Sequence, residues 1–288
     1  MDVIPDSELI LNPDGSIYHL GLQPDEIAAT IIGVGDPDRV AQVSRHFDVI
    51  ETEKNKREFV THTGRIGNQR LTVISTGIGT DNTEIVLTEL DALLNIDLKQ
   101  RVPHPQRKKL KIIRIGTSGA LQEDIPVGAH VVANYAVGLD NLMEFYPLTA
   151  SVAEERISRE LQTHTQLSFS PYCVQGSDSL ITSLAPDLVK GTTLTAPGFY
   201  APQGRSVVLG LKYPNLLSRL ASFNLNGFRI TNLEMETSAY YGLGKLLGHE
   251  VISLNAILAN RFTKQFSPDP QKLVEELIVK TLDRLSVN

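Results

Sequence analysis

The stretch Ala29-Thr30-Ile31-Ile32-Gly33-Val34-Gly35-Asp36-Pro37-Asp38-Arg39 predicts a buried strand that runs through a glycine turn into a helix. Its apolar first half is typical of a strand covered on both faces, and Pro37 suits the first turn of a helix. Backbone N–H groups at such a turn are free to bind, and the helix dipole favours an anion there. A capping turn with Asp36 as N-cap and Arg39 exposed explains the same residues, and both interpretations can hold together.

The alternation of apolar runs and helical spacing continues along the whole chain. Further strands are predicted at 71–74, 110–115, 129–137, 228–233 and 251–258, and helices around 85–94, at 238–248 and in a C-terminal segment whose apolar side runs from Leu273 to Leu285. Strands that alternate with helices predict an α/β fold with a parallel or mixed sheet covered on both faces. A chain of 288 residues without an internal repeat favours one domain over two.

Bulk composition excludes several classes of protein. The net charge of −6 argues against nucleic acid as the main partner, because a protein that binds the phosphate backbone is usually basic. Cys173 is the single cysteine, so no intrachain disulfide can form, which fits a reducing compartment. The N-terminus lacks the basic and apolar regions of a signal peptide, and no apolar run reaches the ~20 residues that span a bilayer. We therefore expect a cytoplasmic protein with no membrane contact.

A second glycine-rich segment, Arg114-Ile115-Gly116-Thr117-Ser118-Gly119, places an arginine at the end of an apolar strand. A buried arginine is costly unless it is paired, and its guanidinium matches the oxygens of phosphate. The neighbouring Gly-Thr-Ser-Gly donors favour a phosphate pocket over the alternative, an internal salt bridge to an acidic residue.

The segment Asn232-Leu233-Glu234-Met235-Glu236-Thr237 places two carboxylates two residues apart, and in an extended segment they face the same way. Carboxylates accept hydrogen bonds from sugar hydroxyls. A general acid/base pair and a metal site are alternatives, although a metal site would need further His or Asp residues nearby. A solvent-facing strand end is the structural alternative, but the flanking Leu233 and Met235 disfavour full exposure.

Position within the predicted sheet brings these motifs together. Gly35, Thr76, Arg114 to Thr117, Glu234 and Asn260 all follow the carboxyl ends of predicted strands or lie at them. Ligands of open α/β sheets bind at that edge. A phosphate pocket beside carboxylates that accept hydrogen bonds from sugar hydroxyls therefore predicts chemistry between phosphate and a sugar.

Three further segments have weaker signals. The loop from Phe199 to Arg205 could stack on a planar base, but such a segment is more often plain surface. His19 has no local partner in sequence. The basic run from Lys99 to Lys111 could bind an anion or nucleic acid, but we favour a solvated loop, because charge runs are usually surface.

Taken in order, these segments resemble the uridine phosphorylase branch of the nucleoside phosphorylase family. The resemblance rests on Gly-Asp-Pro-Asp-Arg at 35–39, Ser-Thr-Gly-Ile-Gly at 75–79, Arg-Ile-Gly-Thr-Ser-Gly at 114–119, Gln-Gly-Arg at 203–205 and Glu-Met-Glu at 234–236. It implies a single nucleoside phosphorylase domain over residues 18–288, preceded by an extension at 1–17. The implied fold is a mixed β-sheet, partly closed into a barrel and flanked by helices. The implied assembly is a dimer-based homo-oligomer, in this branch a hexamer.

The resemblance also implies roles for individual residues. Phosphate would be held by Gly35, Arg39, Arg114, Thr117 and, from a neighbouring subunit, Arg57. The ribose would be held by Glu234, Met235, Glu236 and, across the dimer interface, His19. The base would meet Phe199, Gln203, Arg205 and Arg261. Arg114, Glu236 and Arg205 would be the catalytic residues.

Inorganic phosphate would be a co-substrate, with no organic cofactor. The resemblance implies a potassium site near Glu58 and Ile78 in some relatives, between dimer subunits. Here Asn82 stands where relatives have a serine linked to that cation, which leaves potassium open. The chain also has extra residues around 99–111 and before Phe199, compared with compact bacterial relatives.

The base class follows from leaving-group chemistry together with the resemblance. A purine leaving group is helped by protonation at N7, whereas a pyrimidine leaves as an anion that neutral or cationic donors stabilise. Purine-specific relatives have aspartate where Asn260 stands, and the pair Asn260-Arg261 resembles pyrimidine relatives. The expected reaction is therefore uridine plus phosphate giving uracil plus ribose 1-phosphate. A hydrolytic nucleosidase, a purine nucleoside phosphorylase and a non-catalytic nucleoside-binding or storage protein are the alternatives.

Overall fold

The computed structural model describes residues 3–287. In the first part of the chain the elements are β1 (Thr30–Val34), α1 (Pro37–Ser44), β2 (Val49–Lys56), β3 (Phe59–Ile66), β4 (Gln69–Ser75), α2 (Thr80–Asn95), β5 (Ile96–Asp97), β6 (Val102–Pro103) and β7 (Lys111–Ala120). In the second part they are β8 (His130–Gly138), α3 (Val152–Thr165), β9 (Tyr172–Gln175), α4 (Asp178–Leu184), β10 (Val189–Thr195), α5 (Leu216–Ser222), β11 (Asn232–Glu234), α6 (Thr237–Leu247), β12 (Glu250–Asn260), β13 (Gln265–Phe266) and α7 (Pro270–Val287). Short 3-10 turns lie at Pro24–Glu26, Leu142–Phe145 and Ala201–Gln203.

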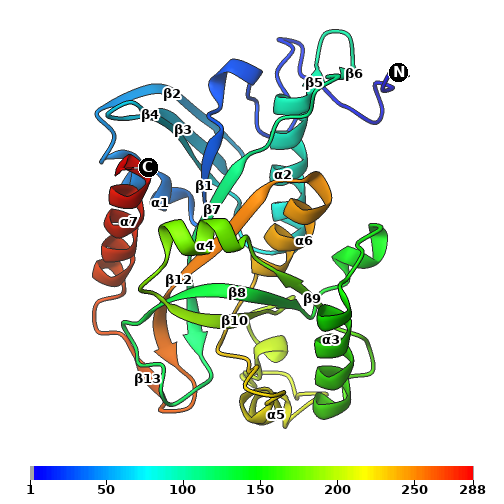
Figure 1. Cartoon of the computed structure of the whole chain (residues 1–288), viewed down its shortest axis with the longest axis vertical. Helices are drawn as coiled ribbons and strands as arrows, with labels where there is room; N and C mark the ends of the chain where they lie inside the picture. Colours follow the sequence, from blue (N-terminus) through cyan, green and yellow to red (C-terminus); the bar gives the residue numbers. More distant parts are fainter. Residues whose placement is uncertain (1–2, 288) are drawn as a thin grey trace.

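A mixed sheet forms the centre of the molecule and closes on itself in one part (Figure 1). Strands β12, β8, β10, β11 and β7 follow one another, and β7 pairs again with β12, which completes a five-stranded barrel. From β7 the sheet continues outward as an open arm through β1, β4, β3 and β2. The expected mixed sheet, partly closed into a barrel and flanked by helices, is confirmed.

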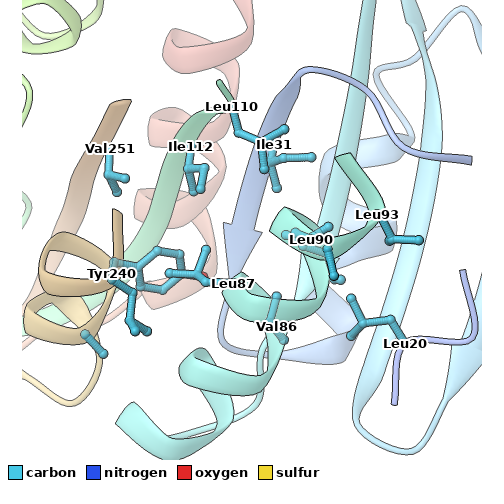
Figure 2. Close-up of a cluster of buried hydrophobic side chains, with 14 of the residues drawn as sticks. Leu20, Ile31, Val86, Leu87, Leu90, Leu93, Leu110, Ile112, Tyr240 and Val251 are labelled. Carbon is cyan, nitrogen blue, oxygen red and sulfur yellow. The ribbon is translucent and has the colours of Figure 1, made fainter. Parts of the chain in front are cut away.

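Alternating side chains divide the core between the two faces of the sheet. Ile31 and Ile112 pack with α2 and α6 on one face, in the cluster that Figure 2 shows around Leu87, Leu90 and Tyr240. The next residues along the same strands point to the other face, where they pack against α1, α4 and α7. Both faces are therefore covered by helices, as the continuous apolar runs of the central strands indicate.

The segment before residue 18 packs against the rest of the chain. Leu9 and Ile17 are buried in the same cluster as α2, and Leu11 bridges to Ile17. The Arg101 side chain binds the carbonyl of Leu9 and pairs with Asp6. Within the described residues, this extension is part of the domain's packing rather than a separate unit.

Two predicted strand boundaries were wrong. The strand expected at 110–115 continues to Ala120, because the barrel closure gives its second half partners on both β11 and β12. The strand expected at 228–233 is reduced to β11, Asn232–Glu234. Phe228 instead pairs back with Leu225 across the turn at Asn226 and Gly227, both of which have positive φ. An Asn-Gly pair is a strong tight-turn signal.

The hairpin of β2 and β3 was not predicted. Strand β2 is an edge strand of the sheet, and its polar residues lack an apolar alternation from which a strand could be recognised. The basic run from Lys99 to Lys111 faces solvent over most of its length, as expected of a solvated segment. It contains β6, which pairs with β5 just before the run. No helix among residues 3–287 is long and apolar enough to cross a membrane.

Candidate active site

A cavity of about 870 Å³ opens where several strands end. It is lined by Gly35 after β1, Gly77 and Ile78 after β4, the second half of β7 from Gly116 to Gly119, and the segment from Leu233 to Glu236 at the end of β11. Arg39, Arg114, Phe199, Gln203 and Arg205 also line it. The sequence motifs from separate parts of the chain therefore meet in one cavity, at the edge of the sheet where α/β proteins bind ligands.

Arg114, Glu234 and Glu236 are buried charged residues that line the cavity, and we call this part of the lining the floor. Arg114 is in the middle of β7 rather than at its end, and only 4% of the side chain is exposed. Its Nη2 contacts Glu234 Oε2 at 2.8 Å and Glu236 Oε2 at 2.6 Å. Its Nη1 donates to Asn255 Oδ1 at 3.1 Å and to Ser253 Oγ at 3.3 Å. The internal salt bridge that the sequence left as the alternative is therefore present, and Arg114 still lines the cavity.

Gly116 provides the space that this guanidinium occupies. A Cβ added at Gly116 would lie 2.0 Å from Arg114 Nη1, since residues two apart on a strand share a face. Any side chain at position 116 would therefore displace Arg114.

Glu234 binds groups of its own chain with both oxygens. Thr195 Oγ1 donates to Oε1 at 2.7 Å, and the backbone N–H groups of Glu236 and Thr237 donate at 2.9 and 3.0 Å. These are free N–H groups at the start of α6, so Glu234 caps that helix from three residues before its first residue. With Arg114 as a further partner, Glu234 supports the site more than it faces the cavity.

Glu236 is the carboxylate with more room for a ligand. Its Oε1 accepts the Gly79 N–H at 2.8 Å and its Oε2 accepts from Arg114. Gly79 has φ of 103°, a conformation that favours glycine, so the Gly77-Ile78-Gly79 turn is built to present this N–H. Burial raises the pKa of Glu236, Arg114 opposes this effect, and Glu234 reinforces it.

The floor of the cavity carries a buried cluster of one arginine and two glutamates. Burial disfavours the charged guanidinium of Arg114, but Glu234 and Glu236 outweigh burial and raise its pKa. One arginine between two glutamates leaves a net negative charge in this cluster. A bound anion therefore needs additional positive charge.

Arg39 supplies such a charge. It follows the Gly35 turn in the first turn of α1, where Asp36 accepts the Asp38 N–H as the predicted N-cap. Its one side-chain hydrogen bond within residues 3–287 goes to the Ile115 carbonyl at 3.5 Å, and it forms no ion pair there. Burial lowers the pKa of Arg39, Asp36 opposes this effect, and Arg114 adds to it. Arginine stays charged even so.

Phe199, Gln203 and Arg205, the lining residues that the sequence assigns to the base, lie on a loop, and we call this part of the cavity the base end. Gln203 is buried, and its Oε1 accepts from Arg205 Nη1 at 2.7 Å. The Arg205 guanidinium lies 3.8 Å from the centre of the Phe199 ring and also donates to the Phe199 carbonyl at 2.6 Å. Arg261 donates to the Gln203 carbonyl at 3.3 Å. Burial, followed by the charge of Arg261, lowers the pKa of Arg205.

Asn260, which stands where purine-specific relatives have aspartate, does not line the cavity. Its amide nitrogen donates to the carbonyls of Gln122 and Ile125, and its oxygen accepts the N–H groups of Phe262 and Thr263. The side chain thus stabilises the turn after β12 by four hydrogen bonds. Support for a pyrimidine comes instead from Gln203 and Arg205, which do line the cavity.

His19 and Arg57 lie outside the cavity of their own chain. The Glu89 carboxylate accepts the backbone N–H of His19 at 3.0 Å and contacts its Nδ1 at 2.6 Å. Because a carboxylate can only accept, Nδ1 carries the proton and Nε2 remains available. The Tyr18 ring contacts His19 edge-on, and the Arg57 guanidinium lies 5.7 Å from the Tyr18 ring centre. These side chains form a separate cluster.

Glu58, Ile78 and Asn82 meet at the cavity rim. Asn82 Nδ2 donates to the Ile78 carbonyl at 3.3 Å. A Cβ added at Gly77 would lie 2.7 Å from Asn82 Nδ2 and 3.3 Å from Glu58 Cγ, so these residues pack closely. Among residues 3–287, no group of three or more His, Cys, Asp or Glu side chains forms a metal cluster.

Sequence reasoning missed some contributors to the site. Thr195 at the end of β10, together with Ser253 and Asn255 on β12, binds the charged cluster directly. These residues lie within ordinary strand sequence. Only the pairing of β12 with β7 reveals that Ser253 and Asn255 face Arg114, and only the pairing of β10 with β11 places Thr195 beside Glu234.

Comparisons with known proteins identify the family and agree with the fold. The family described as "Phosphorylase superfamily" matches residues 29–285. This chain belongs to the phosphorylase superfamily. The matched residues include every strand and helix around the cavity, whereas His19 and the segment before it lie outside the match.

Individual relatives are similar to this chain over nearly its whole length. A solved nucleoside phosphorylase of Trypanosoma brucei, described as showing uridine phosphorylase activity, superposes with a TM-score of 0.88 at 31% identity, over 97% of this chain and 99% of its own. The uridine phosphorylase of Thermococcus kodakarensis is 29% identical over 93% of this chain and 87% of its own. A purine nucleoside phosphorylase DeoD-type of Brevibacillus brevis is 26% identical over 92% of this chain and 97% of its own.

Proposed function

We propose that this chain catalyses the phosphorolysis of uridine, giving uracil and ribose 1-phosphate. It would thus be a pentosyltransferase, with inorganic phosphate as co-substrate. Membership of the superfamily and the uridine phosphorylase relatives support this function. The observation that supports it most is the lining of the cavity. Arg39, which has no ion pair among the described residues, shares this lining with the carboxylate of Glu236 and with Phe199, Gln203 and Arg205.

Phosphate would bind between the Gly35 turn and Thr117. Arg39 supplies the positive charge there, and Arg114 adds a second guanidinium that Glu234 and Glu236 hold in place. Water as the nucleophile would gain nothing from Arg39, whereas a phosphate dianion compensates its charge. This favours a phosphorylase over a nucleosidase. It also favours an enzyme over a storage protein, because the charges meet where the sugar would react.

The ribose would lie on the segment from Glu234 to Glu236, with Glu236 accepting hydrogen bonds from its hydroxyls. As the C1′–N1 bond lengthens, positive charge develops on the ribose and negative charge on the base. A phosphate oxygen then forms the new bond to C1′, and the electron pair of the broken bond leaves with uracil. Positioning and electrostatic stabilisation would supply most of the rate enhancement, without a covalent enzyme intermediate.

The base would bind against Phe199, with Gln203 and Arg205 as donors and Arg261 behind them. A pyrimidine anion spreads its charge over ring oxygens, which suits an amide and a guanidinium. Within residues 3–287, the lining offers no Asp at this end of the cavity to protonate a purine at N7. This observation favours uridine over inosine.

The functional unit would be at least a dimer, with a hexamer as the expected assembly. His19 and Arg57 lie outside their own cavity, so each would complete the site of a neighbouring subunit. Arg57 has φ of 59° at the tip of the β2–β3 hairpin. A non-glycine residue pays about 1–2 kcal/mol for that conformation, which points to a role for the side chain rather than for the turn.

The decisive experiment measures uridine consumption with and without phosphate and identifies the products. Uracil plus ribose 1-phosphate, formed only with phosphate, is the expected result. Uracil plus free ribose without phosphate would make the protein a nucleosidase, and turnover of inosine alone would overturn the assignment of the base end. Binding of uridine without any turnover would favour a storage protein.

Mixing two inactive variants tests the shared site. Arg39→Gln and Arg57→Gln each impair one half of the phosphate pocket. If the two arginines act in one site from different subunits, hybrid dimers regain one intact site, and random mixing restores about a quarter of wild-type activity. The mixture would stay inactive if both arginines served the same subunit.

A further inference from the structure

One row of residues crosses four strands behind the cavity at the same register. Tyr172 on β9 is paired with Gly138 on β8, Gly138 with Thr195 on β10, and Thr195 with Glu234 on β11. The strands β8, β9 and β10 lie together in Figure 1, beside the end of α6 that follows β11. The row ends on the carboxylate that binds Arg114. Tyr172 and Gly138 do not line the cavity.

Tyr172 lies across Gly138 and reaches a buried polar group. A Cβ at Gly138 would lie 2.3 Å from the Tyr172 ring, so only glycine permits this packing. The Tyr172 hydroxyl lies 2.9 Å from both oxygens of Asp140 and 2.8 Å from Ser238 Oγ. Ser238 Oγ in turn donates to Asp140 Oδ2 at 3.0 Å. Asp140 and Ser238 are both buried.

Ser238 connects this triad to the site through its backbone. It lies in the first turn of α6, and its N–H donates to Thr195 Oγ1 at 2.9 Å. The Thr195 hydroxyl then donates to Glu234 Oε1 at 2.7 Å. A continuous chain of hydrogen bonds thus runs from Asp140 and Tyr172, by way of Ser238 and Thr195, to Glu234 and Arg114.

We propose that Tyr172 and Asp140 are positioning residues for the reaction: they fix the first turn of α6, and through Thr195 and Glu234 they set the orientation of Arg114 and Glu236. This role rests on the proposed function. Neither residue touches the substrate, so neither is catalytic. The hydroxyl of Tyr172 is the group through which the pair acts.

The cost of this cluster supports a positioning role. The Asp140 carboxylate is buried and is bound by two hydroxyls and the Leu142 N–H, but by no cation among the described residues. Such a group contributes little to stability, and apolar residues of similar volume often serve as well or better. The cluster also affects the active site, because Tyr172 lies at the register of Glu234. A shift of the α6 turn moves the N–H groups that Glu234 caps, and small displacements of reacting groups cost large factors in rate.

Replacing Tyr172 by Phe removes the hydroxyl and keeps the ring over Gly138. We expect kcat to fall by about tenfold, with the KM for uridine changed by less than about threefold, because the orientation of the groups changes and the cavity remains. Tyr135→Phe is the matched control: Tyr135 is on the neighbouring strand, and its hydroxyl contacts Gln175 at 3.4 Å, outside the network. The control should keep wild-type kcat.

A double variant separates positioning from general destabilisation. In a Glu234→Gln background the network ends on a weakened partner, so adding Tyr172→Phe should lower kcat by less than about twofold further. A full second tenfold loss would mean that Tyr172 acts independently of Glu234 and would overturn the proposal.

Hydrogen exchange tests the same network without relying on activity. The backbone N–H groups of Glu236, Thr237 and Ser238 should exchange faster in Tyr172→Phe than in wild type, and at wild-type rates in Tyr135→Phe. If wild type proves unable to turn over uridine, the proposed function fails, and exchange still decides whether the network holds the α6 turn. Wild-type exchange at all three positions in Tyr172→Phe would overturn the positioning role.

Discussion

The two ends of the cavity are built differently. The floor consists of the middle of β7, the end of β11 and the start of α6, where Arg114, Glu234 and Glu236 are all less than a tenth exposed and bound by several partners. The base end consists of a loop in which Phe199 is 50% exposed and Arg205 is held chiefly by its own neighbours. The floor is fixed by the fold, whereas the base end can change without disturbing the sheet. Reaction type and base preference should therefore respond differently to mutation.

The largest effect is expected at the floor. Arg114→Ala should lower kcat/KM by about 1000-fold, because it removes a charge beside the reacting phosphate. It should also lower the free energy of unfolding by about 3–5 kcal/mol, because two buried carboxylates lose their partner. Enzyme assays together with denaturant unfolding measure both effects.

Leu180→Ala on α4 provides the control for stability. Leu180 is buried on the other face of the sheet, so this variant should also lose about 2–5 kcal/mol of stability while keeping its activity below the unfolding transition. Near-normal turnover by Arg114→Ala would show that Arg114 is only an ion-pair partner.

The second-largest effect is expected at Arg39, where a mutation should weaken phosphate binding without disturbing the charged cluster of the floor. Arg39→Gln should lower kcat/KM for phosphate by about 100-fold with little change in stability, since Arg39 lacks an ion pair in the described structure. Arg45→Gln, at the other end of α1, should leave catalysis unchanged, because Arg45 pairs with Glu275 instead. Phosphate titrations of both variants provide the measurement. Equal phosphate kinetics in the two variants would remove Arg39 from the pocket.

The difference between the two ends also explains what the sequence could predict. Apolar runs and helical spacing located the central strands and the helices α1, α2, α6 and α7, because burial on both faces leaves a clear pattern. The motif at 114–119 indicated a buried arginine in need of a partner, but not which one, because Glu234 and Glu236 are over a hundred residues away along the chain. Only the register of the barrel strands decides that contact.

Other parts of the site left no trace in local sequence. Thr195 and Asn255 look like ordinary strand residues, and their role depends on which strand lies beside them. The resemblance sets Asn260 at the position of the aspartate of purine-specific relatives, whereas in the structure its amide forms hydrogen bonds within the turn after β12. Local patterns therefore predict elements and the edge where they meet, but not the partners that pairing across the sheet creates.

A smaller and more selective effect is expected at the base end. Gln203→Ala should lower kcat/KM for uridine by about 10- to 100-fold, because it removes a donor to the base and releases Arg205. The KM for phosphate should stay at its wild-type value, since the floor is untouched. Ser206→Ala, further along the same loop, is the matched control. A rise in the KM for phosphate equal to that for uridine would mean that the two ends are not independent.

The smallest effect concerns stability against pH in the network behind the floor. Burial raises the pKa of Asp140 above its ordinary value of 3.8, and the Leu142 N–H, Tyr172 and Ser238 only partly oppose it. A carboxyl whose folded pKa is raised favours the folded state fully below its ordinary pKa, and that contribution is lost as pH rises through the folded value. Asp140→Asn should therefore be more stable than wild type at pH 7, by on the order of 1 kcal/mol.

The advantage of Asp140→Asn should shrink as pH falls towards the ordinary carboxyl range, because wild-type Asp140 then becomes neutral as well. Thermal unfolding of both proteins from about pH 4 to pH 8 measures the difference. Asp124→Asn is the control: Asp124 lies on the surface, and its hydrogen bond with Arg229 lowers its pKa, so this variant should show no gain at pH 7. A constant difference between Asp140→Asn and wild type across the range would mean that Asp140 does not titrate there. The cluster behind Glu234 would then hold the floor in the same way at every pH in that range.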